Sequence, residues 1–316
     1  MLNQKSLPLT WTQLTDMKKI LSIVFIIASF WNPIFGQTRI IDMHIHSYTQ
    51  EVLEEERYDY YGIKGVQDEE TLFSETYAAM REFNIVKGVV SGELESVNYW
   101  KSKDSDNRII RGLHFFHPDE LNMDLAQFEE LIKSGKVEVF GELGPYYSGT
   151  TLSDSVWQPY LKICEQYDIP VAVYTGGGDP GGTYTWAPNA RLSLGDPYLI
   201  EDVLVNYPKL RIYLMHNGGE EWHEHALRLM AYYPQLYTDI AVMLWVEPNT
   251  QRTVTDFLKN AKHAGYLDRV MFGSDQMMWP YAIEKSIDFL NSLDFLTEED
   301  KENIFYNNAA KFLRLN

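Results

Sequence analysis

Cysteine is nearly absent from this sequence, which has one, Cys164, in 316 residues. An intramolecular disulfide is therefore excluded, and the fold must be stabilised by its core. Cys164 follows Trp157 and Leu161 at helical spacing. This pattern favours a buried structural thiol over a nucleophile.

Basic residues are also scarce, with 27 Lys and Arg against 45 Asp and Glu and a net charge of −18. This balance argues against nucleic acid or an anionic membrane surface as a partner. Hydrophobic residues make up 45% of the chain, which is typical of a globular protein and not of a disordered one. The charge balance alone does not identify a substrate.

The apolar run Ile20–Trp31 is shorter than the ~20 residues that a helix needs to cross a bilayer. Met17-Lys18-Lys19 precedes it, and Asn32-Pro33 and Ile34-Phe35-Gly36 follow it. This order is typical of a secretory signal peptide, although a buried hydrophobic helix is the alternative. We predict a signal peptide over residues 1–36 with its functional start at Met17. The mature protein is then periplasmic or secreted, without a membrane anchor.

No Gly-x-Gly-x-x-Gly turn follows the first predicted strand, which argues against an open doubly wound sheet. Eight strand-like runs alternate instead with helical patterns from residue 37 to residue 316. Such alternation, with no interdomain linker, predicts one α/β domain, a (β/α)8 TIM barrel. The predicted strands are Ile40–Ser47, Ile85–Val90, Ile109–Phe116, Val137–Leu143, Ile169–Thr175, Leu210–His216, Leu236–Met243 and Arg269–Ser274.

The first strand carries the motif Ile40-Ile41-Asp42-Met43-His44-Ile45-His46. Alternate side chains of a strand leave the same face, so His44 and His46 are expected to point together. Two converging imidazoles can bind one divalent ion, and imidazole suits zinc well. The plain alternative is a pair of ordinary strand histidines.

Other residues with metal-binding side chains end later strands. Glu142 ends the fourth, His216 the sixth and Asp275 the eighth. Active sites of TIM barrels form at the carboxyl ends of the strands, so these residues are expected at one rim with His44 and His46.

The sequence resembles the metal-dependent amidohydrolase superfamily, in particular its amidohydrolase 2 branch. The matching motifs are Asp42-Met43-His44-Ile45-His46, Gly141-Glu142-Leu143-Gly144, His216-Asn217-Gly218-Gly219, Met271-Phe272-Gly273-Ser274-Asp275 and the closing segment Ile304–Leu313. The resemblance implies that His44, His46 and Asp275 are metal ligands. It also implies that Asp275 accepts the proton of the attacking water, and that His216 binds a second metal or polarises the substrate. Glu142 holds the position of a bridging carboxylate.

One position departs from the family pattern. Tyr174, in Tyr174-Thr175-Gly176, stands where the family usually has a histidine at the end of the fifth strand. A phenol with a pKa near 10 is a poor zinc ligand, which favours one bound ion over two. Zinc is the expected ion because imidazole suits it well. Tyr174 is instead expected to donate a hydrogen bond to an oxyanion.

The resemblance implies a hydrolase that cleaves an amide, lactone or ester of a small-molecule substrate with a metal-activated water, and the predicted signal peptide implies that it is secreted. The alternatives are a non-oxidative decarboxylase of the same superfamily and a catalytically inactive binding barrel. Many relatives form dimers, so a homodimer is considered. Further residues weighed for pocket or loop roles are His114, His117, His223, His225, Tyr146, Tyr147, Trp186 and Trp279.

Overall fold

The structure is a computed structural model, and it describes residues 38–315 except 56–58, 61–62, 122, 179 and 247. Residues 39–316 form one compact unit. The predicted signal peptide, residues 1–36, lies outside the described residues.

Eight parallel strands form the central sheet in the order β1-β4-β5-β6-β7-β8-β9-β10. The ring is completed by hydrogen bonds from the Met43 N–H to the Phe272 carbonyl (2.9 Å) and from the Asp275 N–H to the His44 carbonyl (2.8 Å). This is the predicted (β/α)8 barrel. Its strands are β1 Ile40–His46, β4 Ile85–Gly92, β5 Ile109–Phe115, β6 Val139–Leu143, β7 Val171–Tyr174, β8 Ile212–Met215, β9 Leu236–Asp239 and β10 Val270–Met271.

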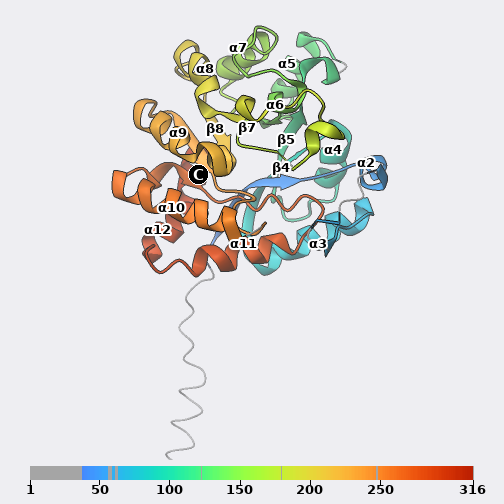
Figure 1. Cartoon of the computed structure of the whole chain (residues 1–316). Coiled ribbons are helices and arrows are strands. Elements are labelled where there is room, and N and C mark those ends of the chain that lie inside the picture. Colours follow the sequence, from blue (N-terminus) through green and yellow to red (C-terminus); the bar gives the residue numbers. More distant parts are fainter. Residues whose placement is uncertain are drawn as a thin grey trace, which may run out of the picture. The chain divides into compact units, whose positions relative to one another are not determined.

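Helices surround the ring of strands, as Figure 1 shows. Side chains cap some of the helix N-termini: Asp68 accepts a hydrogen bond from the Thr71 N–H (2.7 Å) ahead of α3, and Asp124 and Thr297 cap α5 and α12. The helices are α2 Gln50–Glu55, α3 Glu69–Glu82, α4 Leu94–Ser102, α5 Leu125–Lys133, α6 Pro145–Ser148, α7 Gln158–Tyr167, α8 Glu201–Asn206, α9 Gly219–Tyr232, α10 Pro248–Ala264, α11 Ala282–Asn291, α12 Glu298–Glu302 and α13 Asn308–Leu313.

The structure corrects two local predictions. The polar, Tyr-rich sequence of residues 48–67 predicts a loop, but the structure has α2 and the antiparallel strands β2 Asp59–Tyr60 and β3 Ile63–Lys64 there. Asp196-Pro197 predicts the start of a helix that runs to Tyr207, but the structure has a 3-10 turn over Pro197–Ile200 and an α-helix only over α8.

One end of the barrel interior is filled by apolar side chains. Ile41, Met43, Tyr213 and Met271 are buried there, and Phe312 of α13 packs against the Tyr213 ring at a centroid distance of 5.4 Å. The interior can therefore hold a site only at the other end, where the carboxyl ends of the strands lie. Among the described residues, no helix has the length and apolar character required to cross a bilayer.

Candidate metal centre

His44 and His46 converge as their alternation along β1 predicts. Their Nε2 atoms lie 3.1 Å apart, and both side chains are buried. The Nδ1 atom of His44 lies 3.3 Å from the Oδ2 atom of Asp239. An ionised carboxylate only accepts hydrogen bonds, so we assign the His44 proton to Nδ1, which leaves the Nε2 lone pair facing the cluster.

Asp275 enters the cluster through a turn directly after β10. Its φ of 49° is left-handed, which is uncommon for a residue other than glycine, and its N–H is held by the His44 carbonyl. Its Oδ1 atom lies 3.1 Å from His46 Nε2 and 3.6 Å from His44 Nε2. The first and eighth strands thus present ligands to the same point.

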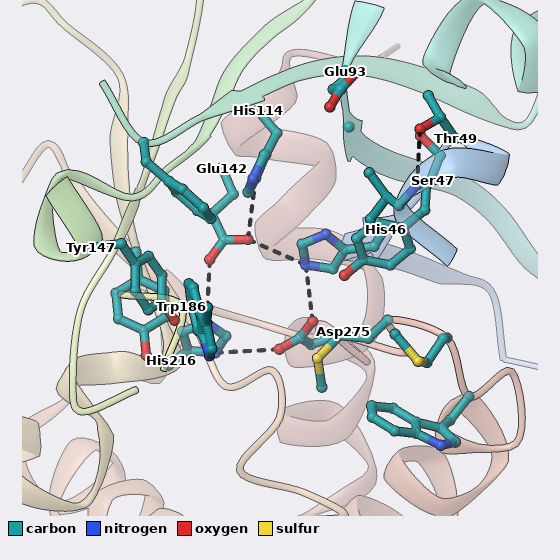
Figure 2. A pocket seen from close by; sticks show the side chains of 18 residues that line it. His46, Ser47, Thr49, Glu93, His114, Glu142, Tyr147, Trp186, His216 and Asp275 are labelled. Carbon is teal, nitrogen blue, oxygen red and sulfur yellow. Dashed lines mark hydrogen bonds and ion pairs between the residues drawn. The ribbon is translucent and has the colours of Figure 1, made fainter. Parts of the chain in front are cut away.

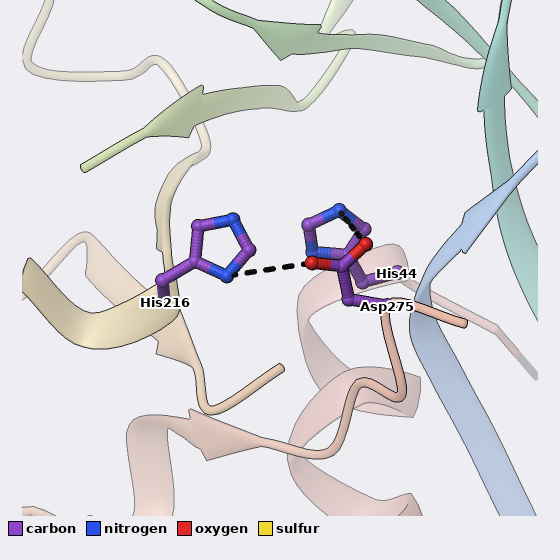
Figure 3. A group of neighbouring side chains, drawn as sticks. All are labelled: His44, His216 and Asp275. Atoms are coloured by element: carbon purple, nitrogen blue, oxygen red, sulfur yellow. Dashed lines mark ion pairs between the residues drawn. The ribbon is translucent and has the colours of Figure 1, made fainter. Parts of the chain in front are cut away.

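His216 also follows its strand with a left-handed φ, of 63°. Its N–H donates to Asp239 Oδ1 (2.8 Å), and its Nδ1 atom lies 3.9 Å from Asp275 Oδ2. Figure 3 shows the Asp275 carboxylate contacting His216 through one oxygen and His44 through the other. Asp239 therefore contacts two elements that carry candidate ligands.

Glu142, at the end of β6, joins the histidines from the other side. Its Oε2 atom lies 3.2 Å from His46 Nε2 and 3.4 Å from His44 Nε2, and its Oε1 atom lies 3.6 Å from His216 Nε2. The carboxylate thus contacts three imidazoles, and Figure 2 shows its contacts with His46 and His216.

The electrostatics favour positive charge at this point. Burial alone would lower the pKa of His46, but its hydrogen bonds to Asp275 and Glu142 and their negative charges raise the pKa to about 9. Burial would raise the pKa of Glu142, yet its hydrogen bonds with His216, His44 and His46 hold that pKa well below the usual range. The cluster therefore stabilises a cation, either a proton or a metal ion.

The donor set fits one divalent ion. The side-chain atoms of His44, His46 and Glu142, and likewise those of His44, His216 and Asp275, lie within 4.8 Å of one another. Nitrogen and oxygen ligands at 2.0–2.1 Å from a tetrahedral ion are separated by about 3.4 Å. The separations of 3.1 to 3.6 Å around the two histidine Nε2 atoms match that value. Asp275 Oδ1 is buried, and it lies 3.1 Å from His46 Nε2 and 3.6 Å from His44 Nε2, where a shared ion could be bound.

A cavity of about 260 Å³ opens above the cluster. This volume suits a small molecule and lies just under the usual range for ligand pockets. The lining residues are His46, Ser47, Tyr48, Thr49, Val52, Gly92, Glu93, His114, Phe116, Glu142, Tyr147, Tyr174, Trp186, His216, Asp275, Met277, Met278 and Trp279.

Of the further residues weighed from the sequence, His114, Tyr147, Trp186 and Trp279 line the cavity. The others do not. His117 Nδ1 lies 3.4 Å from Asp119, His225 Nδ1 lies 2.8 Å from Asp196, and Tyr146 accepts a hydrogen bond from the Gly178 N–H. His223 lies in α9, with its Nδ1 atom 3.3 Å from the Glu220 carbonyl.

Tyr174 ends β7 and lines the cavity, with its ring 5.1 Å from that of His216. Its hydroxyl donates a hydrogen bond of 2.7 Å to the Gly177 carbonyl. To stabilise a substrate oxyanion, the hydroxyl would have to exchange this partner for the substrate.

Sequence reasoning missed the roles of Asp239 and Asp42. Asp42 Oδ1 accepts hydrogen bonds from the N–H groups of His44 (3.0 Å) and Ser274 (2.9 Å), which ties β1 to the turn before Asp275. Burial raises the pKa of Asp42 to about 7. The available signal for Asp42 was an acid in the strand that carries His44 and His46, and for Asp239 an acid in the strand between β8 and β10.

The family comparison supports the motifs. The family model described as Amidohydrolase matches residues 41–315, nearly the whole described chain. Among curated protein sequences, none matches this chain.

Solved structures with the same fold include enzymes of two reaction classes. A probable 2-pyrone-4,6-dicarboxylic acid hydrolase from Acinetobacter baumannii, with citric acid bound, has a TM-score of 0.60 at 14% identity, covering 88% of this chain and 100% of that one. The 5-carboxyvanillate decarboxylase from Sphingomonas paucimobilis has a TM-score of 0.57 at 12% identity, with coverage of 88% and 100%. A dihydroxybenzoic acid decarboxylase from Polaromonas, with bound manganese and 2-nitroresorcinol, has a TM-score of 0.56 at 15% identity, with coverage of 88% and 97%. At these identities the likeness concerns the fold.

Proposed function

Since the chain belongs to the amidohydrolase family, we propose that it is a metal-dependent hydrolase that cleaves an amide, lactone or ester of a small substrate. The observation that carries the proposal is the 3.1 Å separation of His46 Nε2 and Asp275 Oδ1. These atoms come from the first and the last strands of the barrel, and they meet at the floor of the cavity.

His44, His46, Asp275 and Glu142 would hold one divalent ion, and we favour zinc because two of its ligands are imidazoles. When bound, such an ion lowers the pKa of water towards 7 and polarises a carbonyl oxygen. We favour one ion over two because Tyr174 occupies the position of the fifth-strand histidine.

Asp275 has two oxygens with different surroundings. Oδ1 faces His46, whereas Oδ2 lies 3.9 Å from His216 Nδ1. In the proposed reaction Asp275 accepts the proton of the attacking water, and His216 orients or polarises the substrate carbonyl. Tyr174 donates its hydrogen bond to the oxyanion once it releases the Gly177 carbonyl.

The test is hydrolysis of a panel of neutral esters, lactones and amides, before and after removal of metal with a chelator and after addition of Zn²⁺ or Mn²⁺. We expect activity to disappear with the chelator and to return with the metal. Asp275→Asn should abolish turnover while the circular dichroism spectrum is retained. Full activity of Asp275→Asn would contradict its assignment as the base.

A metal-dependent decarboxylase is the alternative function. The solved structures similar in fold to this chain include enzymes named for that reaction. Release of carbon dioxide from an aromatic or enoic acid, without hydrolysis of the panel, would favour it. A protein that binds no metal and turns over neither set would be an inactive binding barrel.

We also propose export to the periplasm or the medium, which amino-terminal sequencing of the mature protein would test.

A further inference from the structure

Apolar and aromatic side chains, among them Tyr48 and Tyr174, line much of the cavity. On one side Phe116, Tyr147 and Trp186 form a connected group, with ring centroids 4.8 Å apart for Phe116–Tyr147 and 4.7 Å apart for Tyr147–Trp186. Figure 2 shows Tyr147 and Trp186 together beside the cluster. The remaining apolar lining residues are Val52, Met277, Met278 and Trp279. Aromatic faces and methionine sulfur favour contact with a planar ring.

The charged side chains of the cavity are mostly acidic. Glu93, Glu142 and Asp275 line it, and none of its described lining residues is Lys or Arg. Glu142 and Asp275 face the histidines of the cluster, so their charges are directed to the proposed ion. Glu93 is exposed, and Figure 2 shows it at a separate position on the border of the cavity.

Glu93 is also the N-cap residue of α4, but its side chain makes no capping hydrogen bond. A helix N-terminus contributes about half a positive charge, which would attract an anion. The full negative charge of Glu93 is larger than this partial positive charge of the helix end. A carboxylate at this border disfavours a second negative charge beside it.

From the apolar lining and this charge, we propose that the cavity selects an uncharged substrate with a planar apolar ring and disfavours the same molecule carrying a ring carboxylate. The inference rests on the proposed hydrolase function. It separates this chain from the enzymes of similar fold whose names specify acids as substrates. Phe116, Tyr147 and Trp186 would hold the ring, and Glu93 would set the charge preference.

Three acetate esters with similar leaving alcohols test it: benzyl acetate, 4-(acetoxymethyl)benzoate and ethyl acetate. At low salt we expect kcat/KM for benzyl acetate to exceed that for the benzoate by about fivefold, because like charges repel. The gap should narrow at high salt, since the Debye length falls from about 10 Å at 0.1 M to about 3 Å at 1 M. Glu93→Gln should reduce the gap towards unity.

Glu95→Gln is the matched control. Glu95 is an exposed acid in the first turn of α4, close to Glu93 in the sequence, and it does not line the cavity. It should keep the wild-type ratio. Trp186→Ala should lower kcat/KM for benzyl acetate relative to ethyl acetate, whereas Tyr184→Ala, at an exposed residue outside the cavity, should not. Equal or faster hydrolysis of the benzoate, with a ratio that Glu93→Gln does not move, would overturn the inference and leave the hydrolase function intact.

A binding measurement separates the two claims if no ester is hydrolysed. N-benzylacetamide and 4-(acetamidomethyl)benzoate can be titrated into the metal-loaded protein by isothermal calorimetry. Tighter binding of the neutral amide, with the difference removed by Glu93→Gln, supports the selectivity even if the hydrolase proposal fails. Tighter or equal binding of the carboxylate in the wild type contradicts it.

Discussion

Asp239 Oδ2 lies 3.3 Å from His44 Nδ1, and both side chains are fully buried. This carboxylate contacts the ring nitrogen of His44 that faces away from the proposed ion. Such contacts fix the tautomer and orientation of a histidine ligand and raise its basicity. The other oxygen of Asp239 accepts hydrogen bonds from the N–H groups of His216 and Ala241. Asp239 is thus a positioning residue for two parts of the site.

Asp239→Asn is therefore expected to weaken metal binding about 10- to 100-fold while the barrel still folds. Competition with a fluorescent chelator measures the affinity, and circular dichroism checks the fold. Asp104→Asn is the control, since Asp104 is a buried carboxylate that contacts none of the site residues, and it should keep the wild-type affinity. Unchanged affinity in Asp239→Asn would show that the contact does not support the ligand.

Tyr174→Phe removes only the hydroxyl that donates to the Gly177 carbonyl. If this hydroxyl serves the oxyanion as proposed, kcat should fall about 10- to 100-fold with little change in metal content. A role confined to holding Gly177 would instead lower stability by about 1 kcal/mol and leave kcat within a fewfold of the wild type. Steady-state kinetics and urea unfolding distinguish the two results.

Asp104 is expected to stabilise the fold in a pH-dependent manner. Burial would raise its pKa, but hydrogen bonds from the Lys101 ammonium and the Ile109 and Arg108 N–H groups outweigh burial, so its pKa is lowered. A carboxyl with a lowered pKa stabilises above its unfolded pKa of about 3.9, and this stabilisation is lost as pH falls through the folded pKa.

Asp104→Asn should accordingly cost about 1–3 kcal/mol at pH 7, with a smaller difference from the wild type below pH about 4. Urea unfolding across this range measures both. A difference that stays constant down to the lowest pH at which both proteins fold would contradict the ionic contribution.

The thiol of Cys164 is predicted to be unreactive in the folded protein. It is fully buried in α7, and burial raises the pKa of this thiol far above its usual value. Ellman's reagent should detect no thiol in native buffer and one per chain in guanidinium chloride. Rapid reaction of the native protein would show that the packing around α7 opens readily.

The barrel and the convergence of the candidate ligands could be predicted from the sequence, because each of these residues lies at or after the end of an apolar run that forms a buried strand. His44, Glu142, His216 and Asp275 all occur at such ends, and parallel strands bring their ends together. The separation of His46 and Asp275 agrees with that expectation.

Other features depend on contacts that no local pattern encodes. Asp239 is a single acid within a predicted strand, and its role arises from His44, which lies far earlier in the chain. Tyr146 and Tyr147 are neighbours in α6, yet only Tyr147 lines the cavity. A four-residue helix is too short for its sequence to reveal which face is buried. The two-residue strands β2 and β3 likewise have no periodicity to detect.

The metal content of the protein purified without added metal tests the central claim most directly. Mass spectrometry of the digested protein should find about one divalent ion per chain, zinc in the proposed case. His46→Ala and Asp275→Ala should each lose most of it, whereas Glu95→Gln should retain it. A wild-type protein that holds no ion, and takes up none on dialysis against Zn²⁺ or Mn²⁺, would contradict the account.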